Sequence, residues 1–269
     1  MTVQVTKEVV HLGIGNYPAD YKLNYTGDLA LATTAYIIVH GAMGNSETTN
    51  GLAQQLAQNY ENQPVFQLDL VNHGTSSSEI YESDIDSYAG YVTEFVTTLR
   101  DQRVIGDDVV LIGHSMGGSV VSTAVLNGLN VSRLVLVSTR PDFTDFGAFL
   151  GTPVEQVPVL FEQLMTAEFS TGLTEEQSQY FISQIPAMSV QPLAGKYDIF
   201  ALSNFNIRDK LHQINVPLTL ITGDSDTTVP LESALEYSRG VSGFAEEFII
   251  EGGTHTAVIK NSELVASYI

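Results

Sequence analysis

One short stretch of this 269-residue chain constrains its fold more than any other. Four apolar residues at positions 109–112 predict a strand buried on both faces of a sheet, and the letters G-H-S-M-G follow at residues 113–117. A helical apolar pattern begins directly afterwards. A strand that turns straight into a helix strains the backbone at its apex, where only small residues two positions away avoid a clash. This context favours Ser115 as a nucleophile raised above the sheet over a Ser in an ordinary glycine-rich turn.

Several other segments extend this strand into a sheet. Buried strands are predicted at residues 35–39, 65–68, 133–138, 216–222 and 247–250, with edge strands at 3–11 and 21–25 joined by turn-prone residues 13–18. Helical patterns at residues 47–60, 88–100 and 231–239, and a last one reaching residue 269, separate or follow them. The alternation predicts an α/β fold with a doubly wound, mostly parallel sheet, whose reactive residues lie where the strands end.

The alternation stops between residues 141 and 213. Helical patches at residues 154–169, 174–185 and 191–205 replace strands there, and prolines punctuate them. An ordinary run of helices packed on the sheet would give the same pattern. An insertion between two central strands is the simpler interpretation, so we expect a core of residues 1–140 and 214–269 and a helical cap of residues 141–213.

A Ser hydroxyl attacks only if a base takes its proton and a carboxylate orients that base. Of six histidines, His255 is favoured as the base because it follows an apolar strand, opens a helix and comes after the Ser in the chain. Two carboxylates, Asp224 and Asp226, end another apolar strand, and Asp142 is a more remote candidate for the acid. The residue types and their spacing do not decide which of these carboxylates is the acid.

These motifs resemble the α/β-hydrolases, and in particular bacterial lidded serine esterase-like members. The resemblance runs through His40-Gly41, residues 113–118, residues 223–230 and residues 253–255, and covers nearly the whole chain. It implies the family fold with an inserted cap. It also assigns the acid to Asp226 through G-x-x-D-x-x-V-P, which makes Asp224 a turn residue.

The same resemblance bears on the oxyanion hole, the pair of donors that a developing oxyanion requires. Met116 N–H is expected to be one donor, from its place after the Ser, and Ala42 N–H the other, from the family's His-Gly-x turn. Many relatives carry a bulkier residue than Ala42 there. A second such turn, His73-Gly74, is expected to order its loop rather than to react.

The leading hypothesis is a serine hydrolase that cleaves small to medium carboxylic esters through an acyl-enzyme. A thioesterase, C–C bond hydrolase, lactonase or perhydrolase on the same triad remains open, as does a non-catalytic sensor of a small ligand. A haloalkane dehalogenase is disfavoured, because Ser115 stands where that relative needs a carboxylate and the chain has no Trp. The residues expected to line a substrate pocket are Met43, His114, Phe143, Phe146, Leu160, Leu164 and Val229.

Composition limits the partners. Eleven Lys and Arg against 31 Asp and Glu give a net charge of −20, which disfavours nucleic acids, anionic membranes and strongly anionic substrates. The absence of Cys excludes disulfides and thiolate sites. No metal-ligand or dinucleotide pattern is recognisable, so we expect no cofactor and no metal. Neither a signal peptide nor a membrane span is recognisable, so a cytoplasmic location is expected, and nothing indicates the oligomeric state.

Overall fold

The computed structural model describes residues 4–14, 17–76 and 81–269. Its centre is an eight-stranded sheet in the order β1-β2-β4-β3-β5-β6-β7-β8. The strands from β3 to β8 run parallel to their neighbours, whereas β1 pairs antiparallel with β2 and β2 with β4. The predicted doubly wound, mostly parallel sheet is therefore confirmed. The strands are β1 (Thr6–Ile14), β2 (Tyr17–Tyr25), β3 (Ala35–Val39), β4 (Val65–Leu68), β5 (Val109–His114), β6 (Arg133–Val137), β7 (Leu218–Gly223) and β8 (Ala245–Ile250).

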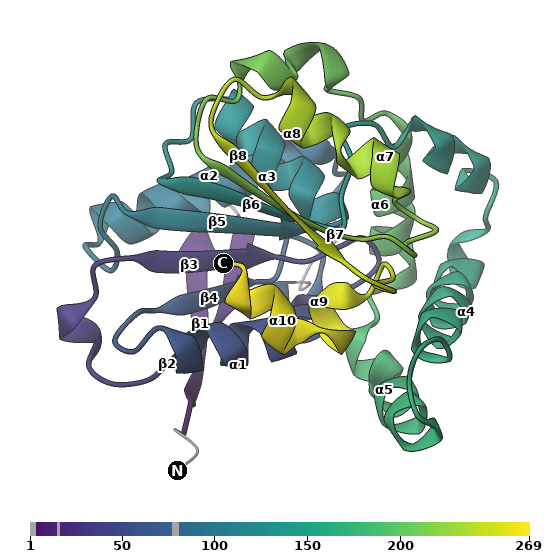
Figure 1. Cartoon of the computed structure of the whole chain (residues 1–269), viewed down its shortest axis with the longest axis horizontal. Helices are drawn as coiled ribbons and strands as arrows, with labels where there is room; N and C mark the ends of the chain where they lie inside the picture. The colour runs from purple at the N-terminus through teal and green to yellow at the C-terminus, as the bar shows by residue number, and fades with distance from the viewer. Residues whose placement is uncertain (1–3, 15–16, 77–80) are drawn as a thin grey trace.

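The central strands are buried and mostly apolar because both faces of the sheet are covered. Successive side chains of a strand point to opposite faces, so Ile37 joins one buried cluster and Ile38 the other. Helices α2, α3, α7 and α8 contribute to the first cluster, and α1, α9 and α10 to the second (Figure 1). These helices are α1 (Asn50–Asn59), α2 (Ile85–Asp101), α3 (Met116–Leu126), α7 (Leu231–Ala234), α8 (Glu236–Gly240), α9 (Ala257–Lys260) and α10 (Ser262–Ser267).

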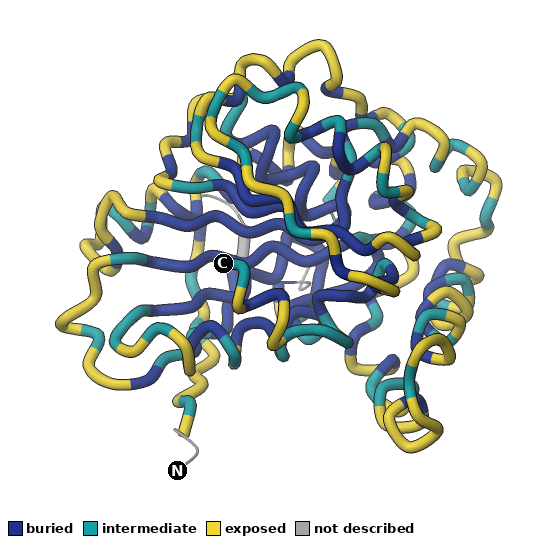
Figure 2. Tube along the Cα trace, in the orientation of Figure 1, coloured by how far each residue is buried: buried dark blue, intermediate teal, exposed yellow. Residues whose placement is uncertain are grey.

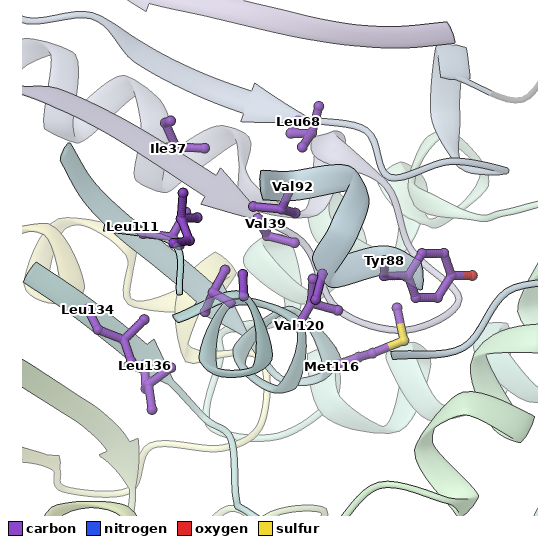
Figure 3. Packing of buried hydrophobic residues seen from close by; sticks show 14 of the residues in the cluster. Ile37, Val39, Leu68, Tyr88, Val92, Leu111, Met116, Val120, Leu134 and Leu136 are labelled. Atoms are coloured by element: carbon purple, nitrogen blue, oxygen red, sulfur yellow. The ribbon is translucent and has the colours of Figure 1, made fainter. Parts of the chain in front are cut away.

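The first of these clusters forms the larger part of the core. Figure 3 shows Ile37, Leu111 and Leu134 from neighbouring strands facing α2 and α3. Burial continues along the full length of β3, β4, β5 and β7, whereas the outer helices and turns expose much of their surface (Figure 2). The strands that carry the Ser and its neighbours are thus held rigidly from both sides.

The segment between β6 and β7, residues 141–213, contains helices and no strand, and we call it the helical insertion. Its helices lie together beside the ends of the parallel strands (Figure 1). Backbone bonds from Phe143 N to Phe205 O (3.0 Å) and from Ile207 N to Pro141 O (2.9 Å) close its base. Its longer helices are α4 (Val157–Phe169), α5 (Glu175–Met188) and α6 (Pro192–Ser203), and short 3₁₀ helices span Thr144–Phe149, Val154–Gln156 and Arg208–Gln213.

Element boundaries differ most from the predictions at the exposed edge. The hairpin of β1 and β2 extends as far as the pair Ile14 and Tyr17. Apolar alternation did not predict this end of the hairpin, because β1 is mostly exposed and needs no regular alternation. The helix predicted at 47–60 is a 3₁₀ turn, Ser46–Thr49, followed by α1, and the one at 231–239 is divided into α7 and α8. Three parts of the chain lie outside the described residues. They are residue 3 of the predicted first strand, residues 15–16 of the predicted turn, and residues 77–80.

Short 3₁₀ helices also occur at Leu29–Leu31 and Gly74–Ser76. Within the described ranges, no helix combines the length and the apolarity needed to cross a membrane.

Candidate active site

Ser115 occupies the sharp turn between β5 and α3. Its backbone has φ 52° and ψ −120°, a left-handed conformation that an L-residue adopts only under constraint. A Cβ on Gly113 would lie 2.4 Å from the carbonyl oxygen of Gly117, and one on Gly117 would lie 2.3 Å from that of Val39. Both glycines are therefore required by close backbone contacts, as the sequence motif predicts.

His255 lies between the Ser and a carboxylate. Its Nε2 is 3.0 Å from Ser115 Oγ and its Nδ1 is 2.9 Å from Asp226 Oδ2. A carboxylate only accepts hydrogen bonds, so Nδ1 carries the proton and Nε2 is free to accept from the Ser hydroxyl. The other oxygen of Asp226 accepts from Thr228 N (2.9 Å) and Val229 N (2.8 Å), which fixes the carboxylate in place. The three residues that the sequence suggested are thus brought into one hydrogen-bonded chain.

The two competing carboxylates lie elsewhere. Asp224 Oδ1 accepts from Gly252 N (2.8 Å) and from the hydroxyl of Ser225 (3.0 Å), so it joins two turns at the end of β7. Asp142 pairs with Arg208 at the base of the helical insertion. Among the described residues, neither carboxylate is hydrogen-bonded or ion-paired to His255.

Two further histidines support the site in their neutral form. His114 Nε2 donates to the backbone oxygen of His255 (3.0 Å), and burial together with the neighbouring His255 lowers the pKa of His114 to about 3. His40 Nε2 accepts from Leu70 N (3.2 Å) while its Nδ1 donates to Gly41 O (2.9 Å). Burial and the neighbouring His73 lower the pKa of His40 to about 4. Both rings therefore hold backbone groups in place near Ser115 and His255.

The loop after β3 places Ala42 beside the Ser. Gly41 lies so close that a Cβ on it would be 3.2 Å from the Cβ of Ser115. Ala42 and Ser115 line one cavity, and Met116 is the first residue of α3. The first N–H groups of a helix have no acceptor within it, so the arrangement suits the binding of a negatively charged oxygen.

Two hollows adjoin these residues. A cavity of about 60 Å³ contains Ser115, His255 and the predicted pocket residue His114, together with Phe161 and Met165 of α4. A second cavity, of about 300 Å³, is bounded by four predicted pocket residues, which are Met43, Phe146, Leu160 and Leu164.

Two other predicted pocket residues do not line these hollows. Phe143 and Val229 are fully buried in the main core. Phe143 packs against Phe146 and Phe205 at the base of the insertion, and Val229 belongs to the turn that holds Asp226. The prediction that they line the pocket is therefore corrected: apolar character indicates burial but not the side on which a residue is buried.

Sequence reasoning missed Asp198 of α6. Its side chain is fully buried and contacts His73, the residue expected only to order its loop. A signal was present, because Asp198 is the one acidic residue of the otherwise largely apolar sequence PLAGKYDIFALS, and a buried carboxylate requires a partner.

Comparisons with known proteins identify the family of this chain. A family model described as "alpha/beta hydrolase fold" matches residues 35–262. The chain belongs to the alpha/beta-hydrolase family. A pimeloyl-[acyl-carrier protein] methyl ester esterase of Vibrio cholerae is 22% identical over 244 residues, which cover 84% of this chain and 89% of that protein.

Two further similarities concern proteins named as esterases. Esterase YbfF of Escherichia coli is 29% identical over 106 residues, or 39% of this chain and 38% of that protein. The solved structure of an esterase from Exiguobacterium antarcticum matches with a TM-score of 0.77 at 20% identity, covering 94% of this chain and 95% of that one. Family membership and these names together support an ester-hydrolysing enzyme.

Proposed function

We propose that this protein is a serine esterase that cleaves small to medium carboxylic esters through an acyl-enzyme. The observation that carries the proposal is the continuous chain of contacts from Asp226 through His255 to Ser115 at 2.9 and 3.0 Å. A ligand sensor would need neither a base within reach of the Ser nor a carboxylate behind that base. The esterase names of the relatives agree with the assignment.

The geometry supports a two-step reaction. Ser115 Oγ attacks the ester carbonyl carbon while His255 Nε2 takes its proton, and the carbonyl oxygen becomes an anion held by the N–H groups of Ala42 and Met116. The bond to the alcohol oxygen then breaks, and His255 returns the proton to the departing alcohol. Water attacks the acyl-Ser with His255 again taking a proton, which releases the acid and restores the Ser hydroxyl. Asp226 holds His255 in the required tautomer throughout.

The helical insertion would act as the cap of this site, with residues 1–140 and 214–269 as the core. Its α4 presents Phe161 and Met165 to the cavity of Ser115 and Leu160 and Leu164 to the larger cavity. A mostly apolar cavity of about 300 Å³ is at the lower end of the usual range for small-molecule sites. We therefore assign the larger cavity to the apolar part of the substrate.

The direct test compares Ser115→Ala with Ser119→Ala. Ser119 is a buried serine one turn further along α3, and its hydroxyl has no hydrogen-bond partner among the described residues. We expect Ser115→Ala to lower the turnover of p-nitrophenyl butyrate by more than about 10³-fold and to abolish labelling by a fluorophosphonate. Ser119→Ala should keep both. Labelling of a folded Ser115→Ala variant would place the nucleophile elsewhere.

A further inference from the structure

A buried polar cluster joins the helical insertion to the core beside the loop that carries Ala42. Asp198 of α6 is at its centre and is fully buried. Its Oδ2 accepts from Met43 N (2.7 Å) and faces His73 Nε2 (2.9 Å), while its Oδ1 accepts from the hydroxyl of Tyr88 (2.9 Å). The carboxylate therefore binds groups from the loops after β3 and β4 and from α2. None of these contacts involves Ser115, His255 or Asp226.

The contacts of His73 define its protonation state. Its Nδ1 lies 2.9 Å from the backbone oxygen of Val71 and its Nε2 2.9 Å from Asp198 Oδ2. Both partners only accept, so both ring nitrogens must donate and the ring is a cation. Burial alone would lower the pKa of His73, but the Asp198 carboxylate outweighs it and the pKa lies above its ordinary value. The charged and titratable neighbours of the ring are Asp198, Asp69, the neutral His40 and the hydroxyl of Tyr88.

Tyr88 completes the cluster from the core side. Its ring packs among the apolar residues of the main core, and its hydroxyl points out of that cluster (Figure 3). The hydroxyl donates a hydrogen bond to Asp198 Oδ1. The buried carboxylate thus has donors on both oxygens, as a buried charge requires.

The link to the site passes through Met43. This residue follows Ala42 directly and has φ 59°, a strained left-handed conformation for a side chain of its size. Such a conformation persists only where the surroundings hold it. Asp198 binds its N–H, and α6 lies close enough that a Cβ on Gly195 would be 3.3 Å from Met43 Cγ. The peptide that joins Ala42 to Met43 is thereby fixed by a group of the helical insertion.

We propose that the ion pair of Asp198 and His73 positions the oxyanion hole, with Asp198 holding the Met43 N–H so that the Ala42 N–H stays directed at the reacting oxygen. The inference rests on the proposed esterase function. Asp198 and His73 are positioning residues, since neither lines the cavity of Ser115 or the larger cavity. The helical insertion then does more than cover the site, because one of its helices supplies a group on which transition-state stabilisation depends.

The test uses Asp198→Ala, Asp198→Asn and, as a control, Asp142→Asn. Asp142 is also a carboxylate of the helical insertion, but it pairs with Arg208 away from the Ala42 loop. The readouts are kcat and KM for p-nitrophenyl butyrate and the inhibition constant of an alkyl trifluoromethyl ketone, whose adduct with Ser115 places an anionic oxygen in the oxyanion hole. If Asp198 only stabilised the fold, its substitution would not lower kcat and the affinity for the ketone by the same factor.

We expect Asp198→Ala to lower kcat about 10- to 100-fold, less than removal of an oxyanion donor because the donor is displaced and not deleted. KM should change little, and the ketone should bind more weakly by a similar factor. Asp198→Asn keeps an acceptor for Met43 and should recover most of the loss, whereas Asp142→Asn should keep wild-type values.

Unchanged kcat and ketone affinity in folded Asp198→Ala, or an equal loss in Asp142→Asn, would overturn the proposal. If Asp198→Ala does not fold, Asp198→Asn decides. Because its acceptor is weaker and uncharged, Asp198→Asn should then lower both kcat and the affinity for the ketone by about threefold or more relative to Asp142→Asn. Equal kcat and equal ketone affinity in these two variants would reject the proposal. Failure of the esterase assignment is recognised separately, because the wild-type enzyme would then neither hydrolyse the ester nor bind the ketone.

Discussion

Glu168 and Thr256 connect the helical insertion to the loop that carries His255. Glu168 Oε2 accepts from both the backbone N–H (3.2 Å) and the hydroxyl (3.1 Å) of Thr256, the residue directly after His255. Lys260 adds bonds to the backbone oxygens of Glu168 (3.0 Å) and Thr171 (3.2 Å). The end of α4 therefore holds the loop of His255, much as α6 holds that of Ala42.

This contact predicts a difference between two substitutions of Glu168. Glu168→Ala removes the acceptor and should lower kcat a few-fold by loosening the loop of His255, whereas Glu168→Gln keeps an acceptor and should stay close to wild type. Steady-state kinetics with p-nitrophenyl butyrate measure both. Equal values for the two variants would show that the contact does not support the base.

The two neighbouring carboxylates should respond differently to the same change. Asp226→Asn should lower kcat by about 10⁴-fold, because His255 would lose the acceptor that fixes its tautomer. Asp224→Asn replaces the charged acceptor of the Gly252 N–H by a weaker, uncharged one and should mainly lower stability. Kinetics and thermal unfolding of both variants separate the effects. A folded Asp224→Asn enzyme slower than Asp226→Asn would reverse the assignment.

Stability should depend on pH through the pair of His73 and Asp198. The raised pKa of His73 means that its stabilisation is complete below the ordinary value of 6.5 and is lost as the pH rises through the folded-state pKa. Burial would raise the pKa of Asp198, but the His73 cation and the hydrogen bonds lower it below 3.8 overall. Its contribution is therefore complete above pH 3.8 and is lost as the pH falls through the lowered value.

We expect the melting temperature of the wild type to fall more steeply above pH 6.5 than that of His73→Gln. The amide of Gln can still donate to Asp198 but does not titrate. The other titrating groups are shared, so the difference between the two curves isolates the pair. Parallel curves from pH 5 to pH 10 would contradict the charged state inferred for His73.

Substrate preference should follow the larger cavity. Its one cationic residue, Arg140, is already paired with Asp145 at 2.5 Å, and the chain carries a net charge of −20. Uncharged acyl chains of short to medium length should therefore be preferred over acyl chains that end in a carboxylate. A series of p-nitrophenyl esters, with half-esters of dicarboxylic acids matched in length, measures this. A preference for the anionic series would refute it.

The same series tests which cavity holds the chain. Leu160→Trp should shift the preference toward shorter acyl groups, because Leu160 lines the larger cavity. Val159→Trp is the control, since Val159 is its neighbour on α4 and is exposed. An equal shift in both variants would argue against this cavity.

The sequence predicted those parts of the site that depend on local geometry. Ser115 is recognisable because its turn requires glycine two positions before and two positions after it, and His255 because it follows a strand at the expected end of the sheet. Asp226 needed a family pattern, since two carboxylates share the turn. Asp198 was not predicted, because its partners lie more than a hundred residues away in the chain. Such contacts are decided by how helices pack and not by any local motif.

The base of the helical insertion has a consequence for how this family can diversify. The chain leaves and re-enters the core through adjacent residues, joined by two backbone hydrogen bonds that involve Pro141, Phe143, Phe205 and Ile207. Backbone bonds do not depend on which side chains lie between them. A graft of different length could therefore replace α4 and α5, whose buried residues lie outside the main core, provided that it brings its own counterpart of Glu168. Helix α6 has to stay, because Ala201 and Leu202 pack into the main core and Asp198 binds the Met43 N–H. We expect a foreign module without a counterpart of Glu168 to leave the sheet intact and yet to lower kcat.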